Sequence, residues 1–517
     1  MTKIWLLGVL VLLLVTVGGA GAQSVPTGTL NIAIPQGGAP LDPTLSTERN
    51  HVTPIFDHLI GIGDDGSLST ATGVAQSWKL APDSKSLTLK IRSGIKFHDG
   101  DDLTSADVKF SLERMTGPKA INTWSGWLRN LIARVETPDA TTVIIHYKKP
   151  NAILPHVLSR QIGNDGAVMP AKYIKEKGED YFAAHPVGSG PYRFVEYKPG
   201  TSFTTEAVPR HWRIGVPRFK NLVFYQVKEE TTRIAMLKTG AADVIQVGRD
   251  QAQSVGTQFK IYEKPGSDRI GLYINYAWAP KTYLSNEKLR EALSISVNRE
   301  EMKNFVFGGY ATVVGGPNCY GSYALGYEEY KVPFDPKRAA QLVQEAFPKD
   351  KPKINLYVFT ERFPEAARMA EAVAGYWDKI GVSTKIIPIQ YATYRAEASK
   401  EEPNLLNSVG LMELGNRLVW DGCFDIILHS KGLLGKNMIR DPKLDALVET
   451  LRAEADPNMV AERQRAVTRY IFQHNIQVSF LEMGSLYAVN PAKIPKWPRL
   501  ARPIAYDISV DDLLKRD

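Results

Sequence analysis

The stretch from Lys353 to Ile389 constrains the fold more than any other part of this 517-residue sequence. An apolar run over residues 354–359 has the length of a buried strand, and a second strand pattern follows over residues 382–387. The segment between them carries an apolar helical stripe, formed by Met369, Val373, Tyr376, Trp377 and Ile380. Gly381 then stands where a left-handed helix stop is expected. Strand, helix and strand in this order predict a crossover between parallel strands, and hence at least one mixed α/β domain.

Other segments continue this alternation of strands and helices. Residues 86–92 and 142–147 alternate polar and apolar side chains, which is the period of a half-buried strand. Thr104, with Asp107 three residues later, has the pattern of a capping box in front of a helix. Asp335-Pro336 places a cap and then a proline at the first position of another helix.

The first 22 residues have the composition of a secretory signal peptide. Lys3 supplies the positive charge, residues 4–17 the apolar core, and Ala20-Gly21-Ala22 the small-residue cleavage pattern. The apolar core is shorter than the ~20 residues that a membrane helix needs. We therefore expect cleavage near Ala22 and a mature periplasmic protein that begins near Gln23. No cysteine lies beside the cut, so we do not expect a lipoprotein.

Charge and cysteine usage exclude several classes of protein. Lys and Arg number 63 against 55 Asp and Glu, so the net charge is +8, but no run of five basic residues concentrates it. We expect no nucleic-acid partner. The two cysteines, Cys319 and Cys423, exclude a disulfide-rich scaffold and a four-thiolate zinc site. In an exported protein they form either one disulfide or two free thiols.

Catalytic and metal-binding motifs are absent from the sequence, which contains no GxSxG, HExxH, Walker loop or CxxC pair. The turn from Gly188 to Tyr192 imitates a phosphate loop, but Pro191 lacks the N–H group that such a loop uses. His51 and His58 lie seven residues apart without a third ligand nearby. We therefore expect a protein that is not an enzyme and that carries no cofactor or metal.

Two segments look like connections between separate bodies. One runs from Asn275 to Pro280, and the other runs from Asn490 to Pro503, where four prolines interrupt regular structure. A strand pattern over residues 504–510 follows the second segment. The chain is thus expected to return to its first body, and two such crossings imply a hinge.

A series of short motifs follows a fixed order along the chain. They are LDP (Leu41 to Pro43), the stretch from Ala75 to Met115 with Trp78, Phe97-His98-Asp99-Gly100 and Ala106-Asp107-Val108, GSGPY (Gly188 to Tyr192), MLKTGAADV (Met236 to Val244), the stretch from Ile270 to Met302, and FDPKRAAQLVQEA (Phe334 to Ala346). In sequence and in order they resemble the family-5 extracellular solute-binding proteins, the dipeptide- and oligopeptide-type receptors of ABC importers. The resemblance covers essentially all of the mature chain.

The resemblance implies an α/β, two-lobed periplasmic binding protein (type II, cluster C) with a hinge of two crossovers. Lobe I would span residues 23–279, with an inserted subdomain over about 66–185, and lobe II would span residues 280–490. Residues 491–517 would form the return crossover and a C-terminal strand of lobe I. Such a protein captures a peptide or another small organic solute by hinge closure. We expect a monomer that delivers its ligand to ABC permease subunits in the inner membrane.

Segments that line the interlobe cleft in this family supply the candidate ligand contacts, because a buried solute needs aromatic walls and a few placed polar groups. They are Gln36 after the first strand, Trp124 and Trp127 in the inserted subdomain, Tyr273, Asn275 and Trp278 at the first crossover, and Arg417, Trp420, Asp421, His429 and Lys431 in lobe II. Arg417 and Asp421 can hold the two charges of a zwitterion, with Trp420 as a wall. Core packing of the aromatic residues and a solvated charged cluster remain the alternatives.

The sequence departs from the peptide receptors after residues 424–428, which we expect to form a strand. Peptide receptors place there an Asp-rich loop whose carboxylate takes the peptide amino group. Residues 429–436 read HSKGLLGK and contain no carboxylate. Either Asp421 takes that role, or the solute is an anionic compound, a glycan or another non-peptide. A sensory or chaperone-like binder on the same fold is a further alternative.

Overall fold

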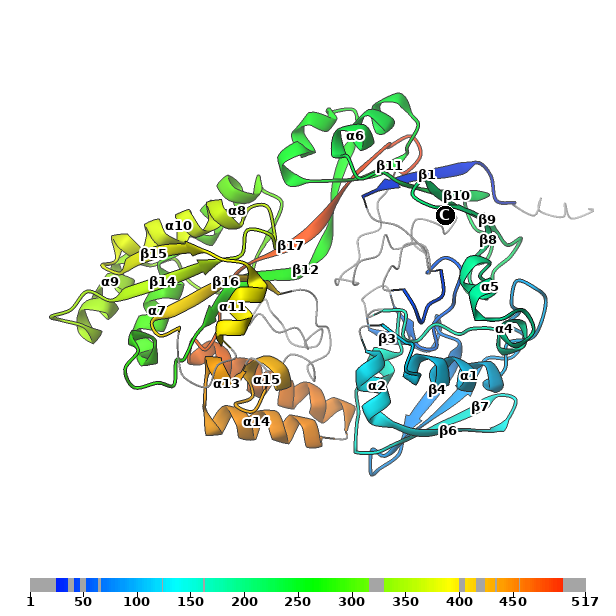
Figure 1. Cartoon of the computed structure of the whole chain (residues 1–517), viewed down its shortest axis with the longest axis horizontal. Helices are drawn as coiled ribbons and strands as arrows, with labels where there is room; N and C mark the ends of the chain where they lie inside the picture. Colours follow the sequence, from blue (N-terminus) through cyan, green and yellow to red (C-terminus); the bar gives the residue numbers. More distant parts are fainter. Residues whose placement is uncertain are drawn as a thin grey trace, which may run out of the picture.

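The computed structural model describes residues 25–35, 41–46, 53–63, 67–122, 124–160, 163–315, 330–398, 405–414, 424–432, 435–454 and 456–495. Its strands and helices form two α/β lobes joined through one mixed sheet (Figure 1). The order of the strands in this sheet is β15-β14-β16-β12-β17-β11-β1-β10-β9-β8, with β13 also paired to β17. The first three strands belong to lobe II, the last five belong to lobe I, and β12 and β17 run through both.

Lobe I contains the part of the sheet from β11 to β8. Its strands are β1 (Thr29–Ile34), β8 (Tyr192–Lys198), β9 (Ser202–Ala207), β10 (Asn221–Gln226) and β11 (Val244–Val247). Its helices are α3 (Leu154–Val157), α4 (Ala171–Lys177), α5 (Glu179–Ala184), α6 (Glu230–Thr239) and the 3₁₀ helix η1 (Arg249–Val255). Strand β1 lies at the centre, parallel to β10 on one side and to β11 on the other.

A second, four-stranded antiparallel sheet forms the lower part of lobe I. Its order is β4 (Ala75–Leu80), β5 (Ser86–Ile91), β7 (Thr142–Tyr147) and β6 (Ile132–Asp139), and the helices α1 (Ser105–Thr116) and α2 (Ser125–Leu131) accompany it. A short pair, β2 (Gly61–Ile62) with β3 (Leu68–Ser69), precedes this sheet. In Figure 1 this part lies below the sheet of lobe I and beside the lower helices of lobe II.

Lobe II contains the other end of the sheet. Its strands are β13 (Thr312–Val313), β14 (Lys353–Val358), β15 (Ser383–Pro388) and β16 (Ser408–Leu414). Its helices are η2 (Tyr283–Ser285), α7 (Glu287–Ile295), α8 (Arg299–Phe307), α9 (Pro336–Ala346), α10 (Ala366–Lys379), α11 (Tyr391–Ala398), η4 (Phe424–Leu428), α13 (Gly435–Met438), α14 (Pro442–Ala453) and α15 (Pro457–Gln473). Residues 408–412 of β16 are all buried, so this strand is covered on both faces, whereas β15 at the edge of the sheet has no buried residue.

The two long strands β12 (Lys260–Ile274) and β17 (Val478–Val489) carry the chain between the lobes. Residues 260–264 pair with residues 485–489 beside β11, whereas Asp268–Ile270 pair with Leu481–Met483 in lobe II. The crossovers expected at Asn275 to Pro280 and Asn490 to Pro503 were therefore misplaced, and lobe II does not extend to residue 490. Proline-rich punctuation marks the end of a strand, but a strand shared by two lobes carries no such mark.

The local predictions from the first half of the sequence are confirmed. Strands β5 and β7 occupy the two segments with alternating polarity and pair with each other. Helix α1 begins with the predicted capping box, in which Asp107 Oδ2 accepts hydrogen bonds from the Thr104 backbone N–H and hydroxyl, both at 2.9 Å. These signals lie within a few residues of the element that they predict.

The predictions for the second half were right in two places and wrong in one. Asp335 caps α9, with Pro336 at its first position, and β14, α10 and β15 form the predicted crossover between parallel strands. Residues 424–428, expected to be a strand, form the π-helix η4 instead. Phe424, Ile427 and Leu428 are fully buried at spacings of three and four, which is a helical face that a short apolar run does not reveal.

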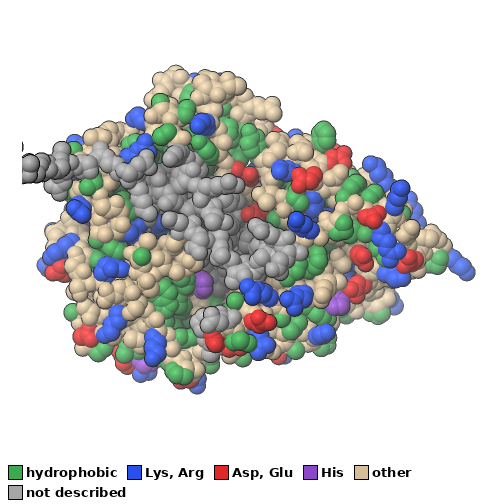
Figure 2. Space-filling model, turned by 180° about the vertical axis from the view of Figure 1, so that it is seen from behind, with side chains coloured by type: hydrophobic (Ala, Val, Ile, Leu, Met, Phe, Trp, Pro, Cys, Tyr) green, Lys and Arg blue, Asp and Glu red, His purple; other side chains and the backbone are tan. Residues whose placement is uncertain are grey.

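The GSGPY motif is a turn, as its proline indicated, and its glycines are required by close packing. A Cβ atom on Gly188 would lie 2.1 Å from the Ile55 carbonyl oxygen, and one on Gly190 would lie 2.5 Å from that of Pro54. The signal peptide, both cysteines and the expected strand over residues 504–510 lie outside the described residues, and residues outside the description are grey in Figure 2. Within the described ranges, no helix has both the length and the apolar character needed to cross a membrane.

Candidate functional site

The sheet of lobe II presents different side chains on its two faces. Ile270, Leu272 and Ile274 of β12 belong to the hydrophobic cluster that includes α7 to α10, whereas Tyr273 belongs to the cluster that includes α13 to α15. This division follows from the alternation of side chains along a strand. Tyr273 thus lies in the same cluster as the helices of lobe II that are nearest to lobe I in Figure 1.

Asn275 is a buried bridge between three segments of lobe II. Its backbone N–H donates to the Ser408 carbonyl at 3.0 Å, and its Nδ2 donates to the Ser408 hydroxyl at 2.9 Å. Its Oδ1 accepts from the Tyr394 hydroxyl at 2.8 Å, and only 2% of the residue is exposed. Asn275 was expected to contact the ligand, and in this structure its hydrogen bonds join β12, β16 and α11.

Tyr276 adopts an unusual backbone conformation immediately after β12. Its φ angle is +50°, a left-handed value that is strained for an aromatic residue. The turn is held by α13, because the Tyr276 N–H donates to the Asn437 carbonyl at 2.7 Å and the Ala277 N–H donates to the Met438 carbonyl at 3.0 Å. The strain is therefore offset by two backbone hydrogen bonds from a separate helix.

The same turn brings Tyr276, Trp278 and Arg440 together. The rings of Tyr276 and Trp278 meet edge to face at 6.1 Å, and the Arg440 guanidinium lies 3.8 Å from the centre of the Trp278 ring. Within the part of the chain that the structure describes, the Tyr276 hydroxyl and Trp278 Nε1 are buried without a hydrogen-bond partner. Two donors and a cation beside an aromatic wall suit a solute that carries acceptor oxygens. Sequence reasoning selected Trp278 but missed Tyr276 and Arg440.

His429 and Lys431 belong to one tight turn, and their side chains differ in exposure. His429 is buried, and its Nδ1 accepts from the Lys431 backbone N–H at 3.1 Å, so its Nε2 donates to Glu449 at 3.2 Å. The Lys431 side chain is exposed. Gly432 closes the turn by donating its N–H to the His429 carbonyl at 2.7 Å.

Helix α14 supplies the carboxylates that the loop itself lacks. Asp445 accepts from the Ser430 backbone N–H at 2.8 Å and from the Ser430 hydroxyl, and Glu449 accepts from His429. Two acidic side chains four residues apart on a helix face the turn together. The spacing between Asp445 and Glu449 is visible in the sequence, but no local pattern predicts that these residues contact the turn at His429.

Trp124 and Trp127 lie at the start of α2 in lobe I. Their rings meet edge to face at 5.6 Å, and Trp124 is 8% exposed within a cluster of apolar side chains. Helix α2 lies on the side of lobe I that faces α14 and α15 (Figure 1). Trp124 is therefore a core residue, whereas the less buried Trp127 remains a proposed contact.

One cavity is lined by described residues of both lobes. Its volume is about 530 Å³, within the usual range for small-molecule sites. It is lined by Trp78, Lys79, Leu80, Ala81, Pro82, Ala152 and Pro155 from lobe I and by Glu454 and Asp456 from lobe II. The cavity shows that the β4–β5 hairpin lies next to the turn between α14 and α15.

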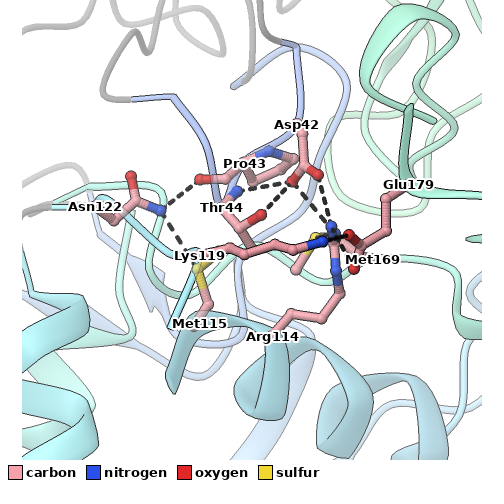
Figure 3. A network of polar contacts seen from close by, with 9 residues as sticks. All are labelled: Asp42, Pro43, Thr44, Arg114, Met115, Lys119, Asn122, Met169 and Glu179. Carbon is pink, nitrogen blue, oxygen red and sulfur yellow. Dashed lines mark hydrogen bonds and ion pairs between the residues drawn. The ribbon is translucent and has the colours of Figure 1, made fainter. Parts of the chain in front are cut away.

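The LDP motif is anchored from below by α1 (Figure 3). Asp42, which is fully buried, accepts from Arg114 Nη2 at 2.7 Å and from the Thr44 backbone N–H at 2.8 Å. Glu179 joins the same network through Arg114 Nη2, which lies 3.8 Å from its Oε1, and the pKa of Glu179 is lowered mainly by a hydrogen bond from Lys119 at 2.8 Å. The segment that follows β1 is thus fixed at its far end, although Gln36 itself lies outside the described residues.

A second buried charge cluster holds the GSGPY turn in lobe I. Asp57 is 1% exposed and accepts from Trp212 Nε1 at 2.7 Å, from His211 Nε2 at 3.1 Å and from Arg213 Nη2 at 3.1 Å. Burial alone would raise the pKa of Asp57, but these partners together hold it well below its usual value. The charged side chains of this cluster are paired with one another, which indicates a structural role.

Two histidines beside this cluster, the buried His58 and the half-buried His98, are in the neutral form. His58 donates from Nε2 to the Gly163 carbonyl at 2.9 Å, and desolvation lowers its pKa to about 3. His98 Nε2 lies 2.9 Å from the Gly190 carbonyl, and desolvation lowers its pKa to about 4. Both are therefore uncharged at neutral pH.

The proposed zwitterion site around Arg417, Trp420 and Asp421 lies outside the described residues, as does Gln36. Among the described residues, no three His, Cys, Asp or Glu side chains gather closely enough to hold a metal ion. The residues that the structure does bring together are Tyr273, Asn275 and Trp278, with the His429 turn adjoining them through α13.

Comparison with solved structures supports the two-lobed fold. The murein tripeptide-binding protein MppA in its unliganded open form has a TM-score of 0.79 at 17% identity, and 93% of this chain and 96% of MppA are covered. HbpA2 from Haemophilus parasuis has a TM-score of 0.76 at 21% identity, with coverage of 90% and 96%. At these identities the likeness shows the architecture alone.

Comparison with curated proteins finds glutathione-binding proteins named GsiB. The protein from Pectobacterium atrosepticum is 30% identical over 319 residues, which are 59% of this chain and 58% of that protein. The protein from Escherichia coli O1:K1 is 31% identical over 295 residues, with coverage of 55% and 54%. The aligned region thus spans little more than half the length of these relatives. The family model of the bacterial extracellular solute-binding proteins, family 5, matches residues 70–411, and the chain belongs to this family.

Proposed function

We propose that this protein is the substrate-binding component of an ABC importer, which captures a peptide or another small organic solute between its lobes and delivers it to membrane permease subunits. The observation that carries the proposal is the passage of β12 and β17 through one sheet shared by two lobes, in a chain of this family. Two lobes joined by a pair of strands can close on a solute that binds the closed state more tightly.

The compartment and the absence of catalysis belong to the same proposal. The leader over residues 1–22 supports export to the periplasm and cleavage near Ala22. The family is one of binding proteins, which supports a role without chemical turnover. The protein would act as a monomer, because one lobe pair provides a complete cleft.

The proposed ligand surface is formed by Tyr276, Trp278 and Arg440 of lobe II, with Tyr273 of the same lobe and Trp127 of lobe I as further walls. Its unpaired donors and its cation favour a solute that carries a carboxylate or amide oxygen, as a peptide does. Asp445 and Glu449 accept from Ser430 and His429, so two carboxylates lie beside the turn at His429 to Lys431, and this turn does not by itself argue against a peptide ammonium.

Native mass spectrometry of protein purified gently from its own host would identify the solute. The protein would then be unfolded, refolded without ligand, and titrated with glutathione and with short peptides in a calorimeter. Release of a peptide and binding of one of these probes would support the proposal. A defined non-peptide solute would support the same role with a different ligand class, and catalytic turnover of the bound compound would contradict the proposal.

The variant Trp278→Ala tests the site with the probe that binds. Loss of a buried aromatic wall is expected to weaken binding about tenfold or more. Tyr181→Ala is the matched control, since Tyr181 is an exposed aromatic residue on α5 that is 45% accessible. Equal affinities of the two variants would remove Trp278 from the site.

A further inference from the structure

The ladder between β12 and β17 is interrupted where the chain passes from one lobe to the other. Lys264 pairs with Ser485 and Asp268 pairs with Met483, so residues 265–267 lie opposite Gly484 alone. An unequal count of residues on two paired strands is a β-bulge, which bends and twists the ladder locally. The crossing therefore has a defined point at which its geometry can change.

Gly484 is held at that point by one charged residue on each side. Glu263 Oε1 accepts from its N–H at 3.1 Å, and its carbonyl accepts from Arg249 Nη2 at 2.5 Å. The Arg249 and Glu263 side chains are 4.0 Å apart, which makes them an ion pair across the bulge. Both backbone groups that the bulge leaves without a ladder partner are thus satisfied by side chains of lobe I.

Arg249 also reaches into lobe II. Its Nε donates at 2.9 Å to the carbonyl of Tyr310, which follows α8. Tyr310 packs against the cluster of lobe I that includes Val255 and Leu486. One guanidinium at the start of η1 therefore binds the bulge and the neighbouring lobe at the same time.

A second contact crosses between the same elements on the outside of the molecule. Arg368 on α10 pairs with Asp250 on η1 at 3.0 Å, and their side chains are 51% and 63% exposed. Exposed ion pairs contribute little to stability, whereas Arg249 is 14% exposed and donates to two carbonyls. Arg249 can therefore hold the two lobes together more firmly than Arg368 can.

We propose that Arg249 is a positioning residue of the hinge: by bridging the Gly484 and Tyr310 carbonyls, it holds the interlobe angle and sets the balance between open and closed states. The role of Arg249 in solute capture rests on the proposed function, whereas its contacts with the Gly484 and Tyr310 carbonyls do not depend on that function. Lysine cannot replace it, because a single ammonium group lacks the fork that reaches two separate carbonyls.

Distances between the lobes in the ligand-free, full-length mature protein test this role. Spin labels introduced through Asn130→Cys on α2 of lobe I and Thr450→Cys on α14 of lobe II would report the distance between the lobes (Figure 1), with Cys319 and Cys423 replaced by serine in every protein compared. Double electron–electron resonance is expected to give a broader and displaced distance distribution in Arg249→Ala and Arg249→Lys. Arg368→Ala is the matched control and should give the distribution of the parent protein.

Three outcomes would overturn the proposal. They are an unchanged distribution in Arg249→Ala, a parent-like distribution in Arg249→Lys, and an equal change in Arg368→Ala. Circular dichroism and urea unfolding would confirm that each variant is folded, and the lysine variant decides the question if the alanine variant is not. No solute is present, so a failure here leaves solute binding untouched, and a failure of solute binding leaves the hinge result valid.

Discussion

Asp57 and Glu263 are two of the carboxylates that lie next to arginines, and they show how differently such a pair can be used. Asp57 in lobe I is fully buried and accepts from His211, Trp212 and Arg213. Glu263 at the crossing is partly exposed, accepts from a backbone N–H and lies 4.0 Å from its arginine. The first arrangement locks a turn within one lobe, whereas the second supports a bulge between two lobes.

The pKa shifts of the two carboxylates go in opposite directions. The partners of Asp57 outweigh burial and lower its pKa, so the charged form is favoured in the folded protein. Burial raises the pKa of Glu263, and Gly484 and Arg249 oppose that shift only in part. Charge is therefore essential at Asp57 and dispensable at Glu263. The following substitutions and titration test this difference, beginning with the largest effect.

Replacing Asp57 by Asn should destabilise the protein strongly. The amide is nearly isosteric but leaves the buried cation of Arg213 without its counter-charge, and breaking such a pair costs about 3–5 kcal/mol. Urea unfolding at pH 7 would measure the loss. Asp250→Asn, which removes an exposed carboxylate, is the control and should change stability by about 0.5 kcal/mol or less. A loss of that size for Asp57→Asn would show that lobe I does not depend on this charge.

Acidification should weaken the same region through its neutral histidines. In the folded protein the pKa of His58 is about 3 and that of His98 about 4, below the ordinary histidine value of 6.5, so the unfolded chain binds more protons than the folded protein between these values. Their contribution is fully present above pH 6.5 and is lost as the pH falls towards 4. Each should cost roughly 2 kcal/mol at pH 5 relative to pH 7.

Unfolding curves between pH 7 and pH 4.5 would measure this loss. His58→Gln keeps a donor for the Gly163 carbonyl and should flatten the profile, whereas the exposed His185→Gln should leave it unchanged. If the stability of His58→Gln fell with pH as steeply as that of the parent protein, His58 would accept a proton in the folded state without penalty.

Replacing Glu263 by Gln should have the smallest effect on stability. Glutamine keeps an acceptor for the Gly484 N–H and removes a charge that burial disfavours, so the change should stay within about 0.5 kcal/mol. The same urea unfolding would compare it with Asp57→Asn, since both are carboxylate-to-amide changes. A loss of several kcal/mol in the free energy of unfolding would show that the crossing depends on its charge as strongly as the core of lobe I does.

The local elements were predictable because their signals are local. The Thr104–Asp107 capping box, the Asp335-Pro336 helix start and the polar alternation of residues 142–147 each lie within the element that they mark. The family resemblance also depended on short motifs in order, and the family match covers much of that region. An apolar run that is too short to show a period does not distinguish a strand from a helix, and for this reason the strand expected at residues 424–428 is a π-helix.

The candidate site was only partly predictable. The family resemblance pointed to the aromatic residues at the end of β12 and after it, and the structure places Trp278 beside Tyr276 and Arg440. Arg440 lies 162 positions after Trp278 (440 − 278), and the strain at Tyr276 depends on backbone bonds from α13. A short stretch of sequence cannot contain both residues of such a contact, so local patterns do not predict it.

By itself, then, the sequence determined the order of strands and helices, their caps and turns, and membership of the solute-binding family. Only the tertiary structure decided where one lobe ends and the other begins, and which charges meet. Arg249 and Gly484 are 235 residues apart, and Asp57 and His211 are 154 apart. Caps and periodicity arise from hydrogen bonds within one or two turns of chain, whereas these pairs exist only once the sheet has brought distant strands into register.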